Sequence, residues 1–567
     1  MRTCPSLKTS AAIGIAILTL AACGGASDLP SPALPNAPAA PTITAQPANI
    51  TVAEGSAGAL SVTAQSNDGP ISYQWRVGST PTAIPGANQA SYATPATTLL
   101  DEGKVFSVVA SNSAGTAISQ NATLSVTERT WTASQLPPTG AAGNAVAQAY
   151  AATAPIVIDS LGHAHALIDQ IESGGGQALW AAFKPAGGAT FSTFTRLTPL
   201  PVDPSAQVRH MQLAADGAGR VIAVWKADVG DEVSNLWAAL YSPSGVGGQW
   251  GEALLVSSLS SIPVEELPQV VASADGKFDM AWRAFRNANQ SHALSARRLT
   301  VDSSGQITLE AEQQVAAHPE NVLRPRLASD GQGRLLAAWS VGLNGHVQTY
   351  AAARLNGGDW SAPSEVDALV DTDAYLTNLV MNRAGQGVLV MKSPGSRLHV
   401  RQFVFNGTAP VWNEGPAQYV ANQYDNDPGA PVVLIDEVNR IHIVAVHGNG
   451  RQLSRWRFDA SWQGLESIRD VSGSALPDQL LYWPSAGLDA AGNLIVTWNE
   501  VAAIGEGQQV RAARHHVGLA QWRPMASIGF DGLAFGGAGM AVHGDGSATL
   551  LQAVSNDGVT LHSAVFR

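Results

Sequence analysis

Two pairs of aspartates, each with one residue between the carboxylates, are the part of this sequence best suited to chemistry. Carboxylates in loops are preferred ligands of Ca²⁺, and paired carboxylates also act as acid and base on glycans. Aromatic residues lie near them in the sequence, a combination that suits sugar rings or cationic peptides. We interpret these residues as a candidate ligand-binding rim, with a merely solvated acidic surface as the alternative. The candidate rim residues are Asp371, Asp373, Asp425, Asp427, Tyr424, Tyr482 and Trp483.

A second pattern, two histidines separated by one residue, could hold a metal ion. His163 and His165 would project from the same face of a strand, as zinc ligands can. Within the repeats described below, however, His165 takes the position that Ile222 and His442 take in other copies. A structural position explains the histidine better, so we predict no metal site here and no cofactor apart from the candidate Ca²⁺.

Several function classes are disfavoured by motifs and composition. The sequence contains no G-x-S-x-G nucleophile elbow, no H-E-x-x-H zinc motif and no phosphate-binding loop. We therefore predict no catalytic residue and favour a binding protein over an enzyme. The net charge of −12 disfavours nucleic acid as a partner, because binding to phosphates requires excess positive charge. Hydrophobic residues make up 45% of the chain, enough to build a large core.

The N-terminal residues have the pattern of a targeting segment. Basic residues Arg2 and Lys8 precede the apolar run 11–20, which is too short to span a bilayer. The sequence LAAC at 20–23 follows directly and resembles the lipobox of bacterial lipoproteins. An ordinary secretory signal that happens to contain a cysteine is the alternative interpretation.

The lipobox resemblance implies that residues 1–22 are a signal peptide. It also implies that Cys23 is acylated, with palmitate as a typical chain, and becomes the new N-terminus. Gly24 after the cysteine implies sorting to the outer membrane if the host is Gram-negative. The membrane would then be a partner through the lipid anchor. Residues 23–40 are rich in Pro and Ala and predict an extended linker.

Residues 41–127 show short alternating strands separated by turn signals. The sequence YQW at 73–75 and the turn DEG at 101–103, followed by an aromatic strand, resemble bacterial immunoglobulin-like domains. The resemblance implies a β-sandwich with Trp75 as its core anchor. The usual cysteines between the sheets are absent, and Val62 and Val108 are the expected apolar substitutes. We expect this domain to be a spacer.

Residues 128–567 repeat a unit of strand, D-x-x-G turn and apolar strand ending in Trp. In two copies the aspartate directly precedes the glycine, at Asp275 and Asp545. The repeats predict an eight-bladed β-propeller, and seven blades is the alternative if one degenerate copy is not a blade. The residues at the glycine position are Gly162, Gly219, Gly276, Gly333, Gly385, Asn439, Gly492 and Gly546.

The strand after each turn is apolar on both faces. In one copy Val221, Ala223 and Trp225 face one way, while Ile222 and Val224 face the other. No helical period is present to supply cover, so sheets must pack on sheets, as propeller blades do.

The two ends of the repeat region predict how the ring closes. Residues 130–133 match the fourth strand of the unit, and the last copy stops after its third strand. We expect the N-terminal piece to complete the last blade.

The turns are similar to the Asp-box of sialidases but have a longer Asp–Gly spacing and lack its serine. Arg209, Arg324 and Arg326 begin inner strands and could imitate a sialidase carboxylate clamp, although no catalytic partners are identifiable. The sequence predicts a lipid-anchored cell-envelope protein whose propeller binds a glycan or a protein partner. A glycan-processing enzyme, sialidase-like or lyase-like, and a scaffold of an envelope protein complex are the alternatives.

Overall fold

The structure is a computed structural model in which the chain divides into two compact units, Met1–Thr127 and Glu128–Arg567. Strands form nearly all of the described secondary structure, which confirms the all-β prediction. No helix among the described residues is long and apolar enough to cross a membrane. Cys23 and the signal segment lie outside the described residues. The structure describes residues 38–136, 155–172, 175–199, 207–229, 233–244, 247–257, 264–286, 291–318, 322–343, 346–366, 375–393, 397–413, 418–421, 431–471, 479–501, 508–517, 522–524, 527–530, 533–556 and 558–567.

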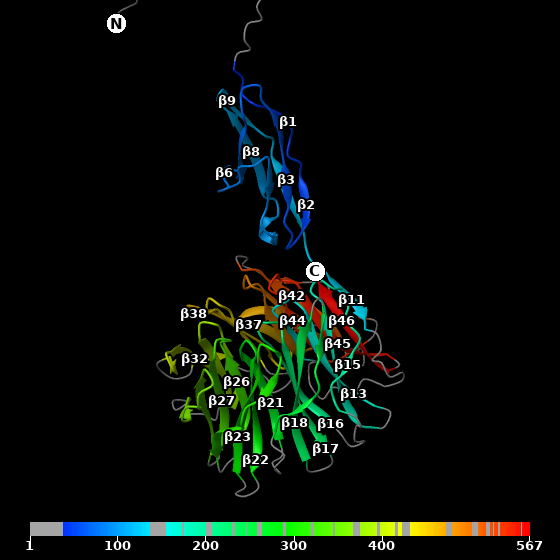
Figure 1. Ribbon diagram of the computed structural model, residues 1–567, viewed down its shortest axis with the longest axis vertical. Helices are drawn as coiled ribbons and strands as arrows, with labels where there is room; N and C mark the ends of the chain where they lie inside the picture. Colours follow the sequence, from blue (N-terminus) through cyan, green and yellow to red (C-terminus); the bar gives the residue numbers. More distant parts are fainter. Residues whose placement is uncertain are drawn as a thin grey trace, which may run out of the picture. The chain divides into compact units, whose positions relative to one another are not determined.

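The N-terminal unit is built around a central antiparallel strand, β8 (Val105–Asn112), which pairs with β5 (Ser72–Val77) and β10 (Ala122–Thr127) (Figure 1). Trp75 on β5 is fully buried, and its indole nitrogen donates to the carbonyl of Gln89 at 3.0 Å. The remaining elements are β1 (Thr42–Ala45), β2 (Ile50–Ala53), β3 (Ala59–Ser61), β4 (Thr63–Gln65), β6 (Thr82–Ala83), β7 (Ser91–Ala93), the 3₁₀ turn η1 (Leu99–Asp101) and β9 (Gly115–Ile118).

The core of this unit contains the residues expected from the sequence. Trp75 packs with Val62 and Val108, which are both buried. Val62 and Val108 therefore make apolar contacts in the core, as expected for residues that replace the cysteines of the usual disulfide.

The second unit is made of antiparallel sheets of four or five strands, except that β40–β46 and β11 join in one eight-stranded sheet through the pairing of β42 with β44. We number the repeated four-stranded units in chain order as blades 1 to 8. In each blade the first three strands follow one another in the sequence, and neighbouring strands pair. The inner strands of blades 1 to 8 are β12 (Ile156–Ile158), β16 (Gln207–Ala215), β21 (Val264–Ala274), β26 (Val322–Ser329), β30 (Tyr375–Met381), β35 (Val432–Ile435), β40 (Leu480–Leu488) and β44 (Leu533–Val542). The second strands are β13 (Ala164–Ile171), β17 (Val221–Val229), β22 (Lys277–Arg286), β27 (Arg334–Leu343), β31 (Gln386–Ser393), β36 (Ile441–His447), β41 (Leu494–Val501) and β45 (Ala548–Asn556).

The outer half of each blade is made by longer third strands and shorter fourth strands. The third strands are β14 (Gln177–Lys184), β18 (Val233–Ser244), β23 (Ser291–Val301), β28 (His346–Leu355), β32 (Arg397–Asn406), β37 (Gln452–Asp459), β42 (Gln508–His515) and β46 (Gly558–Phe566). The fourth strands are β15 (Thr195–Arg196), β19 (Gly247–Trp250), β24 (Ile307–Leu309), β29 (Ser364–Glu365), β33 (Ala409–Trp412), β38 (Ser461–Trp462), β43 (Arg523–Pro524) and, for blade 8, β11 (Trp131–Gln135). Four more strands pair with third strands: β20 (Leu254–Leu255), β25 (Gln313–His318), β34 (Gln418–Ala421) and β39 (Glu466–Asp470).

The ring closes through the inner strands and through β11. Each inner strand lies beside the inner strand of the next blade, and β44 lies beside β12. β11, the first strand of this unit, pairs antiparallel with β46, the last, so that Trp131 lies opposite Phe566 with ring centroids 5.3 Å apart. The prediction that an N-terminal strand completes the last blade is therefore confirmed.

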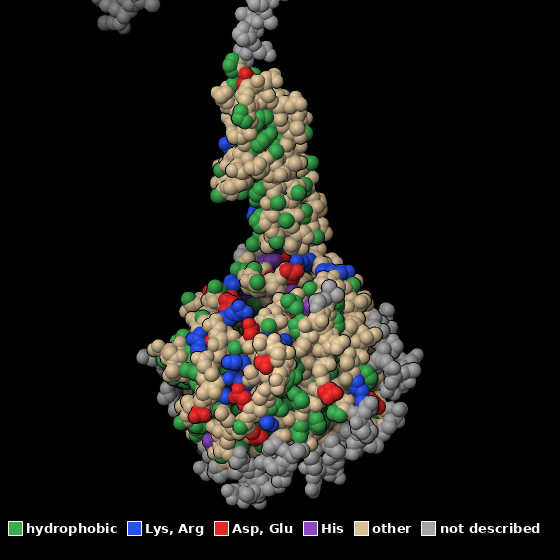
Figure 2. All heavy atoms as spheres, viewed as in Figure 1, with side chains coloured by type: hydrophobic (Ala, Val, Ile, Leu, Met, Phe, Trp, Pro, Cys, Tyr) green, Lys and Arg blue, Asp and Glu red, His purple; other side chains and the backbone are tan. Residues whose placement is uncertain are grey.

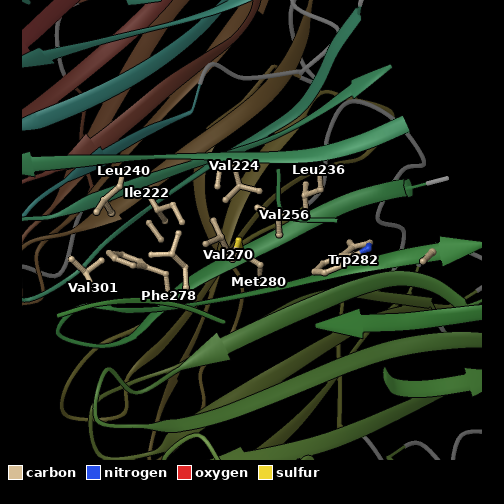
Figure 3. Packing of buried hydrophobic residues seen from close by; sticks show 14 residues of the cluster. Ile222, Val224, Leu236, Leu240, Val256, Val270, Phe278, Met280, Trp282 and Val301 are labelled. Atoms are coloured by element: carbon tan, nitrogen blue, oxygen red, sulfur yellow. The ribbon is translucent and has the colours of Figure 1, made fainter. Parts of the chain in front are cut away.

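Neighbouring blades pack face to face, as the two-sided apolar strands predict. Figure 3 shows the core between blades 2 and 3, where Ile222 and Val224 on β17 meet Phe278, Met280 and Trp282 on β22. The tryptophan face of one blade thus covers the opposite face of the preceding blade. Fully burying each such side chain contributes about 1.5–3 kcal/mol, so these contacts are the main source of stability in the ring.

The D-x-x-G turns also link neighbouring blades. Asp216 Oδ1 accepts from the amides of Ala218 and Arg220 at 2.9 Å each. Its Oδ2 accepts from Arg220 Nε at 2.7 Å and from the amide of Gly276 in the next blade at 2.8 Å. Asn439, the expected replacement for glycine, has the left-handed backbone (φ 64°) that asparagine tolerates. On the propeller face drawn in Figure 2, acidic and basic side chains accordingly lie next to one another.

Two of the degenerate turns differ from the expectation. In blade 8, Gly546 donates its amide to the carbonyl of His543, as Gly219 does to Asp216, so His543 and not Asp545 takes the aspartate position. In blade 3, Asp275 and Gly276 form a tight hairpin between paired residues Ala274 and Lys277. An Asp-Gly pair favours such a two-residue turn.

Candidate functional site

The inner strands of blades 2, 3, 4 and 7 share a β-bulge near their N-terminal ends. In each case two inner-strand residues lie opposite one residue of the second strand. That residue is always the tryptophan of the repeat, and its ring is buried. A bulge bends the strand and disrupts the ladder locally. The four tryptophans are Trp225, Trp282, Trp339 and Trp498.

Three of these bulges begin with a residue in the left-handed region. His210, Arg324 and Trp483 have φ values of 54°, 49° and 44°. A bulky residue with positive φ is strained, typically by about 1–3 kcal/mol, and such strain concentrates at functional sites. The three positions are equivalent in the repeat, each six residues before the aspartate of its turn. The fold therefore imposes the same unusual backbone on blades 2, 4 and 7, and a bulge re-aims the side chain it carries.

Aromatic and cationic side chains are found at these bulges. Arg324 is exposed, and its guanidinium lies 5.1 Å from the centre of the Tyr375 ring at the start of the next inner strand. Tyr482 and Trp483 have ring centroids 5.5 Å apart and are both half-buried. We call His210, Arg324, Tyr375, Tyr482 and Trp483 the bulge surface.

Buried polar groups fix the bulge in blade 7. Glu500, on the strand beside Tyr482, accepts from Arg469 Nη2 at 2.7 Å and from Gln479 Nε2 at 2.7 Å. Trp498, the residue opposite the bulge, donates its indole N–H to Glu500 at 3.3 Å. Burial acts to raise the pKa of Glu500, but the hydrogen bonds and charge of Arg469 hold it below its usual value. Glu500 is thus an anion that orients Trp498.

Adjacent blades hold one another's bulge segments in register. Ser340 of blade 4 accepts from the amide of Leu376 in blade 5 at 2.8 Å. Asn499 of blade 7 donates to the carbonyl of Gly536 in blade 8 at 2.8 Å. These bonds satisfy backbone groups that lie outside the ladder.

Of the candidate rim residues, the structure describes Tyr482 and Trp483 and places both on the bulge surface. The other five, together with the candidate Ca²⁺ ligands among them, lie outside the described residues. In the sequence, Asp371 and Asp373 lie four and two residues before Tyr375. The five rim residues outside the described part of the chain are Asp371, Asp373, Asp425, Asp427 and Tyr424.

The three arginines considered as a clamp have different surroundings. Arg324 is exposed on the bulge surface. Arg326 donates its Nε to the carbonyl of Thr377 at 2.7 Å, which is a structural role between blades 4 and 5. Arg209 has its Nε 3.6 Å from the Asp228 carboxylate. Of the three, Arg324 is therefore the one that is exposed and has a left-handed backbone.

His163 and His165 both point at Asp159, the aspartate of the first turn. Asp159 Oδ2 lies 3.1 Å from His163 Nδ1 and 2.9 Å from His165 Nε2, and all three residues are buried. The ligand atoms lie within 4.8 Å of one another, so the group could hold a metal ion. Hydrogen bonding also explains it, because His163 takes the place of Arg220, which donates to Asp216 in blade 2.

The bulges themselves were not predicted from the sequence, although a signal for them exists. In blades 3, 4 and 7 the second bulge residue is Pro268, Pro325 and Pro484, five residues before the aspartate position. Proline inside a strand pattern marks a bulge or an edge, because it lacks the amide hydrogen that the ladder needs.

No protein-family model and no curated protein matches the sequence. Among solved structures, the chain is similar to the WD40 domain of SCAP from fission yeast, with 8% identity and a TM-score of 0.41 over 77% of this chain and 98% of that one. It is also similar to the NanB sialidase from Streptococcus pneumoniae, with 10% identity and a TM-score of 0.35 over 85% and 87%. A chimeric titin Z1Z2 matches 16% of this chain and 97% of its own, with 24% identity and a TM-score of 0.14. No activity of this chain follows from these likenesses.

Proposed function

We propose that this protein is a lipid-anchored cell-envelope protein whose propeller binds a glycan at the bulge surface. One observation supports this most directly: strained left-handed residues at equivalent positions carry an imidazole, a guanidinium and an indole side chain. The predicted rim aspartates would add to the same surface, because Asp371 and Asp373 lie four and two residues before Tyr375 in the sequence.

The side chains fit carbohydrate better than the other ligands considered. Flat faces of Tyr375, Tyr482 and Trp483 can stack on the apolar faces of sugar rings. Arg324 beside Tyr375 can donate paired hydrogen bonds to hydroxyl or carboxylate oxygens. Because the bulges preset the backbone, binding requires little reordering, which favours affinity.

A glycan array tests this proposal. The ectodomain, residues 30–567, is applied with and without Ca²⁺, and we expect specific binding that Trp483→Ala weakens at least tenfold. Trp412→Ala is the matched control. Trp412 is also half-buried, but it lies on the fourth strand β33, and none of the residues of the bulge surface is on that strand. Array binding that Trp483→Ala leaves unchanged would refute the assignment to the bulge surface. A blank array would favour an envelope-complex scaffold instead.

The role of Ca²⁺ is tested in the same assay. The variant with Asn at all four rim aspartates should lose any Ca²⁺ dependence of binding. A glycan-processing enzyme is the second candidate function, and it would use these carboxylate pairs as acid and base. Turnover of an array-positive glycan, lost in the same variant, would convert the binding proposal into an enzymatic one.

The anchor is tested through Cys23. Expression in the presence of a palmitate analogue should label the wild-type chain, and the protein should sediment with membranes. Cys23→Ser should abolish both. Labelling that persists in Cys23→Ser, or a wild-type chain that stays unlabelled and unattached, would contradict lipid anchoring without affecting the glycan proposal.

A further inference from the structure

The repeat brings the same three positions together between each pair of blades. The first is the residue three after the turn glycine, on the second strand, and the next is its cross-strand partner on the third strand. The last comes from the third strand of the following blade. We call these three positions the inter-blade slot. Between blades 2 and 3 it contains Ile222, Leu240 and Leu299 and is apolar.

Between blades 3 and 4 the slot contains a buried carboxylate held by two arginines. Asp279 accepts from Arg298 Nη2 at 2.8 Å and from Arg354 Nη1 at 3.0 Å. Ser273 Oγ donates to the same carboxylate at 2.5 Å. All three charged side chains are at most 3% exposed. Here the protein supplies the anion that its own guanidinium groups require.

Between blades 6 and 7 the slot contains one arginine and two histidines and lacks that carboxylate. His442 takes the position of Asp279, Arg457 that of Arg298, and His515 that of Arg354. His442 and His515 are both buried.

A further arginine, Arg455, lies beside this slot and has no counterpart in the other blades. It pairs with Val444 across the strands, and its side chain is 0% exposed. The equivalent residue in every other blade is small, so the positive charge is particular to this slot. Those residues are Ala181, Ala238, Ala296, Ala351, Val400, Ala512 and Ser563.

The polar atoms of this slot are incompletely satisfied. Neither ring nitrogen of His442 has a hydrogen-bond partner in the protein, and neither do Nε and Nη1 of Arg455. Glu466, which is partly exposed, contacts Arg455 through Nη2, and its other oxygen lies 4.0 Å from Arg457 Nε. The Arg455 guanidinium also lies 4.9 Å from the centre of the Trp522 ring. A buried donor without a partner costs about 1–3 kcal/mol, and more when it is charged.

Electrostatics in the slot are positive from several directions. Burial, together with the charges of Arg455, Arg440 and Arg457, lowers the pKa of His442 to about 3. Burial and Arg455 likewise lower the pKa of His515 to about 4, whereas Glu466 acts to raise it. Asp436, six residues before His442, is already bonded to Arg440.

We propose that the slot between blades 6 and 7 is a binding site for a small anion, of the size of a halide or a carboxylate. The anion would accept from Arg455 and from the ring N–H of His442, as the Asp279 carboxylate accepts from its arginines in the equivalent slot. This site is independent of the bulge surface and of any glycan.

Thermal melting of the ectodomain tests the proposal. Chloride, bromide and formate are each titrated at constant ionic strength against gluconate, a much larger anion. We expect a saturable rise in Tm of about 3 °C once the anion reaches about 100 times its Kd. Arg455→Ala, which installs the residue found in most of the other blades, should remove the rise. Arg220→Ala makes the same charge change at a turn and should keep it.

A substitution inside the slot provides the sharper test. His442→Asp supplies the carboxylate from the chain, as blade 3 does, and should raise Tm in gluconate while abolishing the response to chloride. Crystals grown in bromide should show an anomalous peak beside Arg455 and His442 of the wild-type protein. A response to chloride that is equal in wild type and Arg455→Ala would overturn the proposal. Wild-type crystals grown in bromide with no peak in the slot would also overturn it, and that result does not depend on any variant folding.

Discussion

Removing the charge of Asp279 should destabilise the propeller more than any comparable surface substitution. Asp279→Asn keeps the size of the side chain but leaves Arg298 as a buried cation without a counter-ion, and Arg354 with only the partly exposed Glu310, 3.4 Å away. Both guanidinium groups contact the carboxylate at 2.8–3.0 Å, and neither side chain is more than 3% exposed.

The expected magnitude follows from burial. A unit charge pair about 4 Å apart gains about 4 kcal/mol at an effective dielectric constant of 20. Breaking a buried pair by removing one partner typically costs about 3–5 kcal/mol. A unit of this size unfolds with a large entropy, so we expect the loss to lower Tm by only about 4 °C. Urea denaturation followed by tryptophan fluorescence is therefore the more sensitive assay.

Two further variants separate charge from packing. Asp302→Asn, at a fully exposed carboxylate, should leave the denaturation midpoint unchanged. Replacing the whole triad by apolar residues, as Asp279→Leu with Arg298→Ala and Arg354→Leu, should recover most of the loss, because the slot of blade 2 is apolar and well packed. A cost below about 1 kcal/mol for Asp279→Asn would refute the view that the triad is electrostatically buried.

Three other perturbations have defined outcomes. Deleting residues 128–136 removes β11 and should open the ring, seen as a large fall in Tm by calorimetry; unchanged melting would contradict the closure. Trp75→Ala should cost the N-terminal unit about 3–5 kcal/mol in urea denaturation, with Trp462→Ala in the propeller as the control that leaves this unit unaffected. Stability should rise between pH 4 and 6.5, because His442 and His515, with pKa values lowered by burial to about 3 and 4, bind fewer protons when folded than when unfolded. Burial raises the pKa of Asp169 to about 7, so its contribution to the stability of the folded protein is lost as pH rises from about 4 to 7 and opposes that of the histidines. Asp169→Asn should therefore steepen the rise of stability with pH. A flat profile in that variant would count against neutral, buried His442 and His515.

Much of the fold could be predicted because its signals are local. The D-x-x-G turns follow from the hydrogen bonds of one aspartate and the backbone freedom of one glycine, as Asp216 and Gly219 show. The two-sided apolar strand of residues 221–225 predicts burial between sheets, and Figure 3 shows that packing. The match of residues 130–133 to a fourth strand predicted the closing pair with β46.

The candidate site was predicted only in part. Residue type and nearby acidic loops indicate Tyr482 and Trp483 as candidate ligand-binding residues, and both lie at a bulge. The left-handed backbone of Arg324 and its contact with Tyr375 had no equivalent prediction. A bulge depends on the register between two strands, and register is set by pairing across the sheet rather than by either strand alone.

The sequence by itself determined the class of fold, the repeat and the closing strand, because each depends on residues a few positions apart or on a pattern that recurs. Tertiary structure decided which charges meet. Asp279 and Arg354 are 75 residues apart and come together because adjacent blades present equivalent positions to one another. The same geometry places His442, Arg457 and His515 in one slot with Arg455. Electrostatic partnership depends on distance in space and on exclusion of water, and neither is written in the local order of residues.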